Sequence, residues 1–504
     1  MKLFKSVIII SLLPLFAWAD DISSQKIDSI VEDVMTIFSV PGISVGVIQN
    51  GKVTHAKGYG VRAITGDGMV DVDTYFGIAS NSKGFTATAL ALLVEDGKIK
   101  WDDPVKKHLS EFKLWDSYIT DNFSIRDLLS HHTGLPLGSG DLMWWPDANY
   151  QPDEIIRKMR YLKPNRGFRT TYEYNNLPFI VAGALIPAVT GKSYEDFLQQ
   201  RIFEPLNMDR CTANTPLMAN DNNIAVPHAV LDGSLKQIKR YLVIDSVAGS
   251  MAAAGIQCSL DDLLKWQMMH INHGQGFMNR NSHDALWQVN TAMNVDEKQM
   301  IQDKTHFRGY GLGFSLNDYH GVKVISHGGA LIGMYSNLTM APEIGFAITI
   351  VTNQQSGAAY TAIKNQILNY VLDVANPVTT TEIFMSVEKS RLNEQQLSGD
   401  GRPALEFDKY VGIYNDHWWD DVEISKNDNG LYFSSKRSPS LRGKLIHFEA
   451  NVFIVRWDDR NHEADAYVYF SIDNNDQING FTMKAVSTRT DFSYDFHHIN
   501  MIKR

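Results

Sequence analysis

Ser80 and Lys83 place a hydroxyl and an amine three positions apart, where an apolar stretch begins near Phe85. If this stretch is a helix, residues at i and i+3 share a face, so the amine points toward the hydroxyl. A serine hydroxyl is a weak nucleophile until a neighbouring base takes its proton. The spacing therefore predicts a nucleophile and its base, although the same pattern also arises by chance in a chain of 504 residues.

Tyr174 and Asn176 form a second polar pair, just before an apolar run that includes Phe179. From a loop, both side chains can point into one cleft. An ammonium group lowers the pKa of a nearby phenol, so a tyrosine beside a lysine can act as a general base. Turn formation explains the same residues without catalysis, because asparagine tolerates unusual backbone conformations and tyrosine packs well.

His327 follows a predicted strand and precedes two glycines and an alanine at 328–330. Glycines let a substrate backbone come close, and the histidine is placed to orient the tyrosine or to contact substrate. A bend that ends the strand is the structural alternative. A further segment, 124–136, is predicted to be a short capped helix that runs into a turn and shapes the cleft.

The elements that must position these groups fall into two blocks. A helix is predicted over 25–38, and strands at 43–48 and 53–59 are joined by Asn50-Gly51, the strongest short hairpin signal. Strands return only after residue 320, and a helix follows them. The strands and helix of this second block are predicted at 322–326, 334–340, 346–352 and 357–374.

The segment between the two blocks is mostly helix and loop. Apolar spacing predicts its helices at 124–130, 152–162, 177–189, 193–202 and 259–272. This order indicates an α+β domain over residues 20–375, in which one antiparallel sheet is flanked by terminal helices and carries an inserted helical subdomain.

The remaining chain has a different pattern. Residues 376–404 are polar and weakly patterned, which predicts a linker. Over residues 405–504, short alternating runs separated by turns predict a small all-β barrel. The clearest strands of this barrel are predicted at 422–424, 431–434, 452–457, 466–472 and 480–484.

Composition limits the range of functions. The chain is 44% hydrophobic and 21% charged, with a formal net charge of -10, which is ordinary for globular domains. It offers no basic footprint for nucleic acid and no electrostatic attraction to anionic lipid. We expect a small-molecule or peptide substrate as the partner, and the oligomeric state stays open.

Residues 1–19 are predicted to be a secretory signal peptide. Lys2 and Lys5 precede an apolar run, and Ala17-Trp18-Ala19 supplies a small-x-small cleavage site. The run is too short for a stable membrane span, and an uncleaved N-terminal anchor is the alternative. The expected location is periplasmic or extracellular.

Cys211 and Cys258 are the two cysteines of the chain. In an exported protein they can form a disulfide, but two buried thiols fit the sequence equally well. Two cysteines without a C-x-x-C pattern exclude a disulfide scaffold and a cysteine zinc site.

In this order, the serine–lysine, tyrosine–asparagine and histidine–glycine motifs resemble those of the penicillin-recognising serine hydrolases. The similar branch contains class C β-lactamases, D-alanyl-D-alanine carboxypeptidases, D-aminopeptidases and esterases, and the resemblance covers about residues 25–375. Five framing segments also resemble the family: 75–80, 127–136, 204–208, 248–251 and 310–314. The segments 410–414, 441–443 and 491–496 resemble a small lipocalin-like barrel that some members carry.

The resemblance implies a role for each catalytic motif. Ser80 attacks a carbonyl group and forms an acyl-enzyme. Lys83 and Tyr174 share the proton transfers, and which of them is the base in acylation stays open. Asn176 hydrogen-bonds the substrate amide and Lys83. No metal and no cofactor are implied.

The substrate side of the site departs from the family. The resemblance implies an oxyanion hole formed by the backbone N–H groups of Ser80 and Ala330, beside Gly329. β-Lactamases usually have lysine, threonine or serine, then glycine, where this chain has His327-Gly328-Gly329. A histidine is mostly neutral at pH 7 and lacks the hydroxyl, so recognition of a substrate carboxylate is weakened.

We therefore expect an exported serine hydrolase that cleaves amide or ester bonds. The alternatives are a β-lactam-hydrolysing class C-like β-lactamase or a D-alanyl-D-alanine carboxypeptidase. A non-catalytic penicillin-binding sensor or envelope scaffold is an alternative from another class. An α/β-hydrolase is excluded, because the chain has no G-x-S-x-G elbow.

Overall fold

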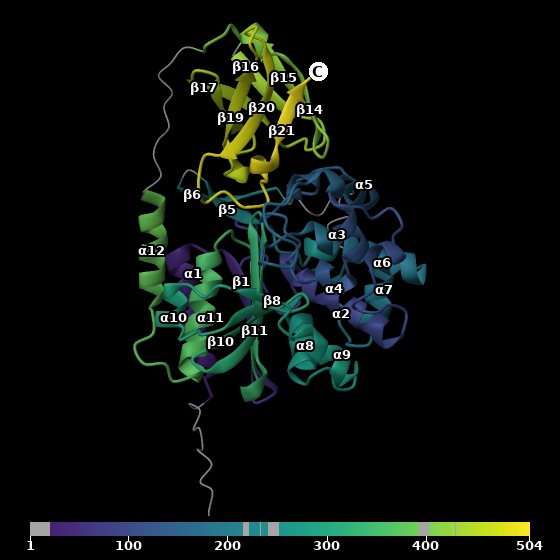
Figure 1. Cartoon of the computed structure of the whole chain (residues 1–504). Helices are drawn as coiled ribbons and strands as arrows, with labels where there is room; N and C mark the ends of the chain where they lie inside the picture. Colours follow the sequence, from purple (N-terminus) through teal and green to yellow (C-terminus); the bar gives the residue numbers. More distant parts are fainter. Residues whose placement is uncertain (1–20, 215–220, 232, 240–250, 393–402, 429) are drawn as a thin grey trace, which may run out of the picture.

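The structure is a computed structural model that describes residues 21–214, 221–231, 233–239, 251–392, 403–428 and 430–504. It consists of an α+β body and a C-terminal β-barrel at one end of that body (Figure 1). The predicted signal peptide at 1–19 lies outside the described residues.

An antiparallel sheet of eight strands forms the centre of the body. Its strands are β1 (Gly42–Gln49), β2 (Lys52–Gly60), β8 (Thr291–Met293), β9 (Arg308–Tyr310), β10 (Ser315–Tyr319), β11 (Val322–Leu331), β12 (Met334–Ala341) and β13 (Phe346–Thr352). Their order is β2-β1-β13-β12-β11-β10-β9-β8. The N-terminal hairpin therefore joins strands from the far end of the domain, with Ile43 opposite Thr352.

The hairpin turn confirms the prediction from Asn50 and Gly51. Their φ angles are 50° and 68°, so both residues adopt the left-handed conformation that a tight two-residue hairpin turn requires. Glycine and asparagine adopt this conformation at the lowest cost.

The described helices of the body cover both faces of the sheet and fill the insertion. They are α1 (Ser24–Phe38), α2 (Ser82–Glu95), α3 (Ser117–Asn122), α4 (Ile125–Leu128), α5 (Pro152–Lys158), α6 (Leu177–Thr190), α7 (Tyr194–Leu198), α8 (Leu260–Ile271), α9 (Arg280–Leu286), α10 (Glu297–Gln302), α11 (Gly357–Val371) and α12 (Thr380–Leu392).

Each face of the sheet has its own covering layer. On one face, apolar residues of α1 and α11, such as Val34 and Ile363, pack in one cluster with Val45 of β1. On the other face α8 comes so close that a Cβ on Gly46 would lie 2.8 Å from the methyl groups of Leu264. Fully burying an aliphatic side chain of this size contributes about 1.5–3 kcal/mol, so these layers fix the sheet.

Two helices of the insertion are buried on every side. In α2 the residues from Ser82 to Leu93 are buried, and in α6 those from Leu177 to Gly183 are buried. Among the described residues, no single helix is long and apolar enough to cross a membrane; α6 passes such a test only together with 194–203, at a bend of 80°. Both buried helices begin next to the predicted catalytic motifs.

The C-terminal barrel is closed by pairing of its first and last strands. Its strands are β14 (Gly412–Asp416), β15 (Asp420–Asn427), β16 (Gly430–Ser435), β17 (Arg442–Glu449), β18 (Val452–Trp457), β19 (Ala466–Ile472), β20 (Ile478–Ala485) and β21 (Asn500–Lys503). Aromatic side chains fill its interior, with the rings of Tyr414 and Phe481 5.0 Å apart and those of Phe433 and Trp457 5.4 Å apart. The predicted barrel is confirmed.

The predicted linker over 376–404 needs correction. Part of it forms α12, which packs against α1 through an edge-on contact between Phe384 and Phe38, with ring centroids 5.4 Å apart. Few apolar residues of α12 make this contact. Their spacing is therefore too brief to indicate a helix in the sequence.

Cys211 and Cys258 form a disulfide, which decides the alternative that the sequence left open. They lie opposite each other in a small sheet made by β3 (Phe76–Gly77), β7 (Gln257–Cys258) and β4 (Cys211–Thr212). A separate hairpin pairs β5 (His228–Leu231) with β6 (Ser234–Gln237). The disulfide therefore anchors the chain just after a helical turn, Met251–Gly255, whose Ala253 carbonyl oxygen accepts from Lys83.

Replacing Cys211 and Cys258 by alanine should lower the free energy of unfolding by about 2–4 kcal/mol, because the crosslink restricts the unfolded chain. Urea denaturation followed by tryptophan fluorescence measures the change. Wild-type protein kept in reductant should unfold at the same urea concentration as the double variant. An unchanged midpoint would show that the bond does not stabilise the fold.

Candidate active site

Ser80 lies in a single 3-10 turn, Ala79–Asn81, that leads into α2. Ala79 has a φ angle of 50°, a left-handed conformation that is unfavourable for alanine and is retained only where surrounding contacts enforce it. Asn81 Nδ2 donates to Ser336 Oγ at 2.9 Å, and this hydroxyl donates to the carbonyl oxygen of Ile78 at 2.7 Å. The turn thus presents Ser80 from a rigid support.

Gly329 of β11 lies directly against this turn. A Cβ there would lie 2.3 Å from the Ile78 carbonyl oxygen and 2.3 Å from Ser336 Oγ. A glycine is therefore needed here for β11 to pass close to the turn that holds Ser80. The prediction that this strand ends at residue 326 is wrong, because Gly329 pairs with Ser336 inside a strand that continues to Leu331.

The side chain of Lys83 is fully buried. The residue has 0% of its surface exposed. Its Nζ lies 3.1 Å from Ser80 Oγ, 2.6 Å from Asn176 Oδ1 and 2.8 Å from the carbonyl oxygen of Ala253. An ammonium group has three N–H donors, so these three oxygens match its full bonding capacity.

Burial lowers the pKa of Lys83 from 10.5 to about 7, while the negative charge of Asp141 acts in the opposite direction. Removing an amine from water destabilises its charged form. Near neutral pH a large share of Lys83 is therefore uncharged and can accept the proton of Ser80. The hydroxyl and amine predicted from the sequence are in hydrogen-bond contact.

Tyr174 hydrogen-bonds Ser80 from another side of the site. Burial raises the pKa of Tyr174 well above its ordinary value, although the bond to Ser80 lowers it. The expectation of a lowered phenol pKa is therefore wrong, because burial outweighs any favourable charge. The ring packs on His131, with centroids 4.2 Å apart, and His131 Nδ1 accepts from the Asn175 N–H at 3.2 Å.

Asn176 lies between Lys83 and a carboxylate that the sequence analysis missed. Its Oδ1 accepts from Lys83, and its Nδ2 donates to Asp141 Oδ2 at 2.7 Å. Trp144 Nε1 donates to Asp141 Oδ1 at 2.9 Å, and Ser493 Oγ of the barrel donates to Asp141 Oδ2 at 3.0 Å. Burial raises the pKa of Asp141 to about 7 despite these bonds. A single orientation of the Asn176 amide therefore satisfies both Lys83 and Asp141.

His327 is a neutral member of the site. Its Nδ1 lies 2.6 Å from the Gly328 carbonyl oxygen and its Nε2 lies 3.0 Å from the Tyr310 hydroxyl. A carbonyl only accepts, so Nδ1 carries the proton and Nε2 accepts from the tyrosine. Burial and the nearby Lys83 lower the pKa of His327 to about 3. The histidine orients Tyr310 rather than Tyr174.

One cleft of about 270 Å³ brings these groups together. Its lining includes all the predicted site residues except Lys83, whose amine contacts Ser80 from the interior of the fold. The lining residues are Ser80, Trp144, Trp145, Tyr172, Tyr174, Asn176, Ala254, His327, Gly328, Gly329, Ala330, Tyr360, Asp491, Phe492 and Ser493. The aromatic loop near Trp144 and a segment of the distant barrel therefore form part of the same surface.

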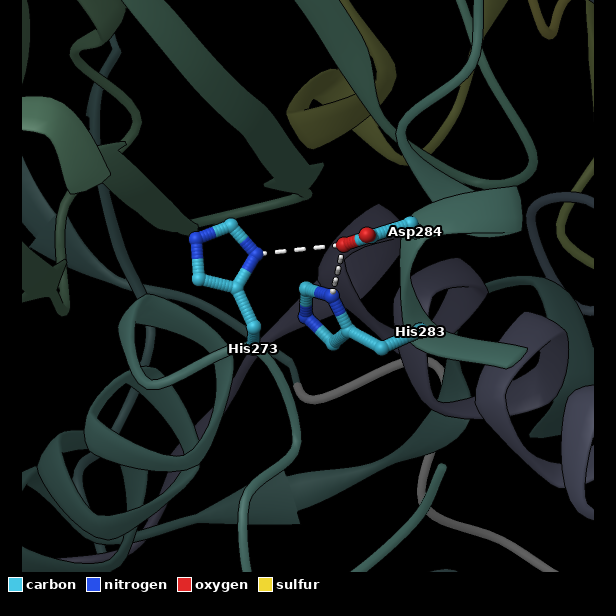
Figure 2. Close-up of side chains that lie close together, drawn as sticks. All are labelled: His273, His283 and Asp284. Carbon is cyan, nitrogen blue, oxygen red and sulfur yellow. Dashed lines mark hydrogen bonds and ion pairs between the residues drawn. The ribbon is translucent and has the colours of Figure 1, made fainter. Parts of the chain in front are cut away.

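Two described clusters outside this lining bring together side chains of the metal-ligating kind. In the first, Asp284 Oδ1 lies 3.1 Å from His273 Nδ1 and 3.4 Å from His283 Nδ1 (Figure 2). His283 Nε2 also lies 3.0 Å from His270 Nδ1. A chain of N–H donors from His270 through His283 to Asp284 satisfies these contacts without an ion. The second cluster is Asp495, His497 and His498.

Comparison with known families agrees with this architecture. The model of the Beta-lactamase family matches residues 27–372, and that of a domain of unknown function, DUF3471, matches residues 398–503. The chain belongs to the Beta-lactamase family, and its DUF3471 domain is the eight-stranded barrel.

Individual relatives are more distant. The unguisins hydrolase ungD' of Aspergillus campestris is 29% identical over 361 residues, which are 70% of this chain and 66% of that protein. Protein flp of Staphylococcus aureus is 26% identical over 348 residues, 66% of this chain and 64% of its own length. The chain thus spans slightly less than two thirds of the length of these relatives.

Solved structures match nearly the whole chain. The octameric penicillin-binding protein homologue from Pyrococcus abyssi has a TM-score of 0.61 and 22% identity, and the match covers 96% of this chain and 100% of that one. The structure titled SurE has a TM-score of 0.56 and 17% identity, with 95% and 99% covered. At these identities the likeness establishes the fold alone.

Asp141 should act as a positioning residue for Asn176 and Lys83. In Asp141→Asn the loss of negative charge destabilises the Lys83 ammonium and lowers the pKa of Lys83. The midpoint of the rise in Ser80 reactivity should therefore shift to lower pH. A disturbed Asn176 should also slow the reaction by about 10-fold. The rate of Ser80 modification by a fluorophosphonate, followed from pH 5 to pH 9, measures both effects.

The exposed acid Asp153 of α5 offers the matched control, since Asp153→Asn removes the same charge at the surface. This variant should keep the wild-type profile. An Asp141→Asn profile with an unchanged midpoint would show that this carboxylate does not act on Lys83.

Proposed function

We propose that the protein is a serine hydrolase that cleaves amide or ester bonds through an acyl-enzyme at Ser80. The observation that carries the proposal is the 3.1 Å contact between Ser80 Oγ and the buried amine of Lys83, whose pKa lies at about 7. A hydroxyl next to a neutral amine can lose its proton as it attacks a carbonyl carbon.

The proton transfers divide between two residues. Lys83 takes the proton of Ser80 as the bond from Oγ to the carbonyl carbon forms. Tyr174 keeps its own proton in the resting site, since burial raises its pKa. It donates this proton to the leaving amine or alcohol and takes the proton from Lys83 in return, so that Lys83 is again a neutral amine. Attack of a water on the acyl-enzyme, with Lys83 as base again, releases the acid and restores Ser80.

Two backbone donors are proposed to stabilise the oxyanion. The N–H groups of Ser80 and Ala330 belong to segments that meet at the cleft, held together where Gly329 passes the turn before α2. Donors fixed at such positions contribute several kcal/mol to transition-state stabilisation.

The substrate side of the cleft favours amide and ester substrates that carry no free carboxylate group. His327 is neutral and its ring nitrogens are occupied by Tyr310 and Gly328, so it supplies no positive charge. Two relatives are named for hydrolysis of unguisins, which supports a hydrolytic function. The neutral His327 disfavours a penicillin or D-alanyl-D-alanine substrate, because binding of the substrate carboxylate requires a cation.

Export is proposed as the setting of this activity. The segment 1–19 has the charge and apolar pattern of a signal peptide, and the disulfide between Cys211 and Cys258 is typical of oxidising compartments.

Wild-type protein incubated with a nitrophenyl ester or an activated amide should carry an acyl group on Ser80, visible by intact-mass spectrometry, and should turn it over. Ser80→Ala should lose the adduct and at least about 10³-fold of the activity. The exposed Ser117 supplies the control variant Ser117→Ala. An adduct that is never hydrolysed would indicate a sensor instead of an enzyme.

The pH dependence identifies the base. If Lys83 accepts the proton, the acylation rate should rise through about pH 7 and stay level above it, because deprotonation of the amine creates the base. Tyr174→Phe should lower the plateau without moving the midpoint, and Lys83→Met should abolish the rise. A midpoint near pH 10 or above would assign the role to Tyr174.

A further inference from the structure

Two histidines and an aspartate meet between the end of α8 and α9. Asp284 Oδ1 lies 3.1 Å from His273 Nδ1 and 3.4 Å from His283 Nδ1, and Figure 2 shows both rings turned toward this one oxygen. The three atoms all lie within 4.8 Å of one another. Imidazole nitrogen and carboxylate oxygen are ligands that Zn²⁺ commonly binds together.

The spacing of these atoms fits a shared metal ion. A charge-assisted N–H···O bond is usually about 2.7–2.9 Å long, whereas His283 Nδ1 lies 3.4 Å from Asp284 Oδ1. In a tetrahedral zinc site with bonds of about 2.0–2.1 Å, two ligand atoms lie about 3.3 Å apart. Both contacts of Asp284 Oδ1 are close to that spacing.

The buried His270 gives a second reason. Its Nδ1 lies 3.0 Å from His283 Nε2, and its own Nε2 has no hydrogen-bond partner among the residues that the structure describes. If N–H donors run from His270 to Asp284 without an ion, His270 Nε2 carries a lone pair. The rings of Trp266 and Phe314 pack against this imidazole, with centroids 4.4 and 5.2 Å from its own. Ring faces are electron-rich, so these surroundings favour a proton at Nε2 over a lone pair.

A metal ion would reverse this chain of donors. An ion bound to His283 Nδ1 takes the place of the proton there, so His283 Nε2 carries the proton and donates to His270 Nδ1. His270 then has its own proton on Nε2, next to the aromatic rings. A hydrogen bond from the second nitrogen of a ligating histidine is the usual support of a metal site.

The cluster is partly open to solvent. The side chain of His283 has 0% of its surface exposed, whereas those of His273 and Asp284 have 32% and 40% exposed. An ion can therefore enter from solvent, while the core holds one ligand fixed. His273 also has a φ angle of 53°, in the turn after α8 where glycine or asparagine is usual. Such a conformation is retained only where the surroundings enforce it.

We propose that His273, His283 and Asp284 bind a Zn²⁺ ion, with water at the fourth position. The ion would join the turn after α8 to α9, and both helices pack against α2, for example through the stacked rings of Trp266 and Phe85, 3.9 Å apart. None of the three ligands lines the catalytic cleft. The proposal therefore goes beyond the hydrolytic function and does not depend on it.

Titration of the full-length protein with Zn²⁺ tests the proposal. Protein treated with EDTA and then dialysed should bind Zn²⁺ with a micromolar or lower Kd, measured by competition with a chromophoric zinc indicator. Mg²⁺ and Ca²⁺, which prefer oxygen ligands, should not displace the ion. Binding only at millimolar Zn²⁺, as expected of scattered surface histidines, would overturn the proposal.

Substitution of one ligand assigns the bound ion. His273→Asn should weaken Zn²⁺ binding by at least about 100-fold, and asparagine tolerates the left-handed turn. His320 offers the matched control, because it is also partly buried and has a φ angle of 47°. His320→Asn should keep the wild-type affinity. An unchanged affinity in His273→Asn would overturn the proposal.

The cluster of Asp495, His497 and His498 is the second place where an ion could bind. If the wild-type protein binds two ions, His273→Asn should lose one of them and keep the other. Loss of neither ion in this variant would place both outside the proposed site and overturn the proposal.

Urea denaturation provides an independent measurement. Zn²⁺ should raise the urea midpoint of the wild-type protein, because an ion that binds only the folded state stabilises it. Asp284→Asn should lose most of this Zn²⁺-dependent rise, whatever its midpoint without the ion. Asp153→Asn removes the same kind of carboxylate from an i,i+4 pair with arginine, and it should keep the rise. A rise of equal size in Asp284→Asn would contradict the assignment of this ligand and overturn the proposed site.

Discussion

The burial of one lysine amine is the constraint on which the rest of the structure depends. An amine in water holds its proton at neutral pH, and removal from water lowers its pKa so that it can act as a base there. Lys83 achieves this because α2 is buried on all sides and α6 covers it from the insertion. Three oxygen atoms then satisfy the amine, so that its burial does not leave an unpaired polar group.

An amide separates the amine from the nearest carboxylate. A direct ion pair between Lys83 and Asp141 would stabilise the ammonium form and remove the base. Asn176 instead accepts a hydrogen bond from Lys83 and donates one to Asp141. The carboxylate therefore orients the amide, and its charge acts on Lys83 without a direct contact. The arrangement holds Lys83 and Asn176 firmly and leaves the proton of Lys83 exchangeable.

Local patterns in the sequence were sufficient to predict much of this molecule. The spacing of Ser80 and Lys83, the Asn50-Gly51 turn and the alternation of the barrel strands depend on neighbouring residues, and each appears as expected in the structure. Asp141 gave no such signal, because its contacts with Asn176 and Ser493 join residues that are 35 and 352 positions apart. The pKa of Tyr174 was misjudged for a related reason, since burial is a property of the whole fold.

The contact between Ser493 and Asp141 joins residues 352 positions apart. During synthesis Ser80 and Lys83 are made long before the barrel segment that contains Ser493. A chain without the barrel would contain Ser80 and Lys83 but lack the wall of the cleft that residues 491–493 form. The cleft described here is therefore complete only when the barrel is folded against the body.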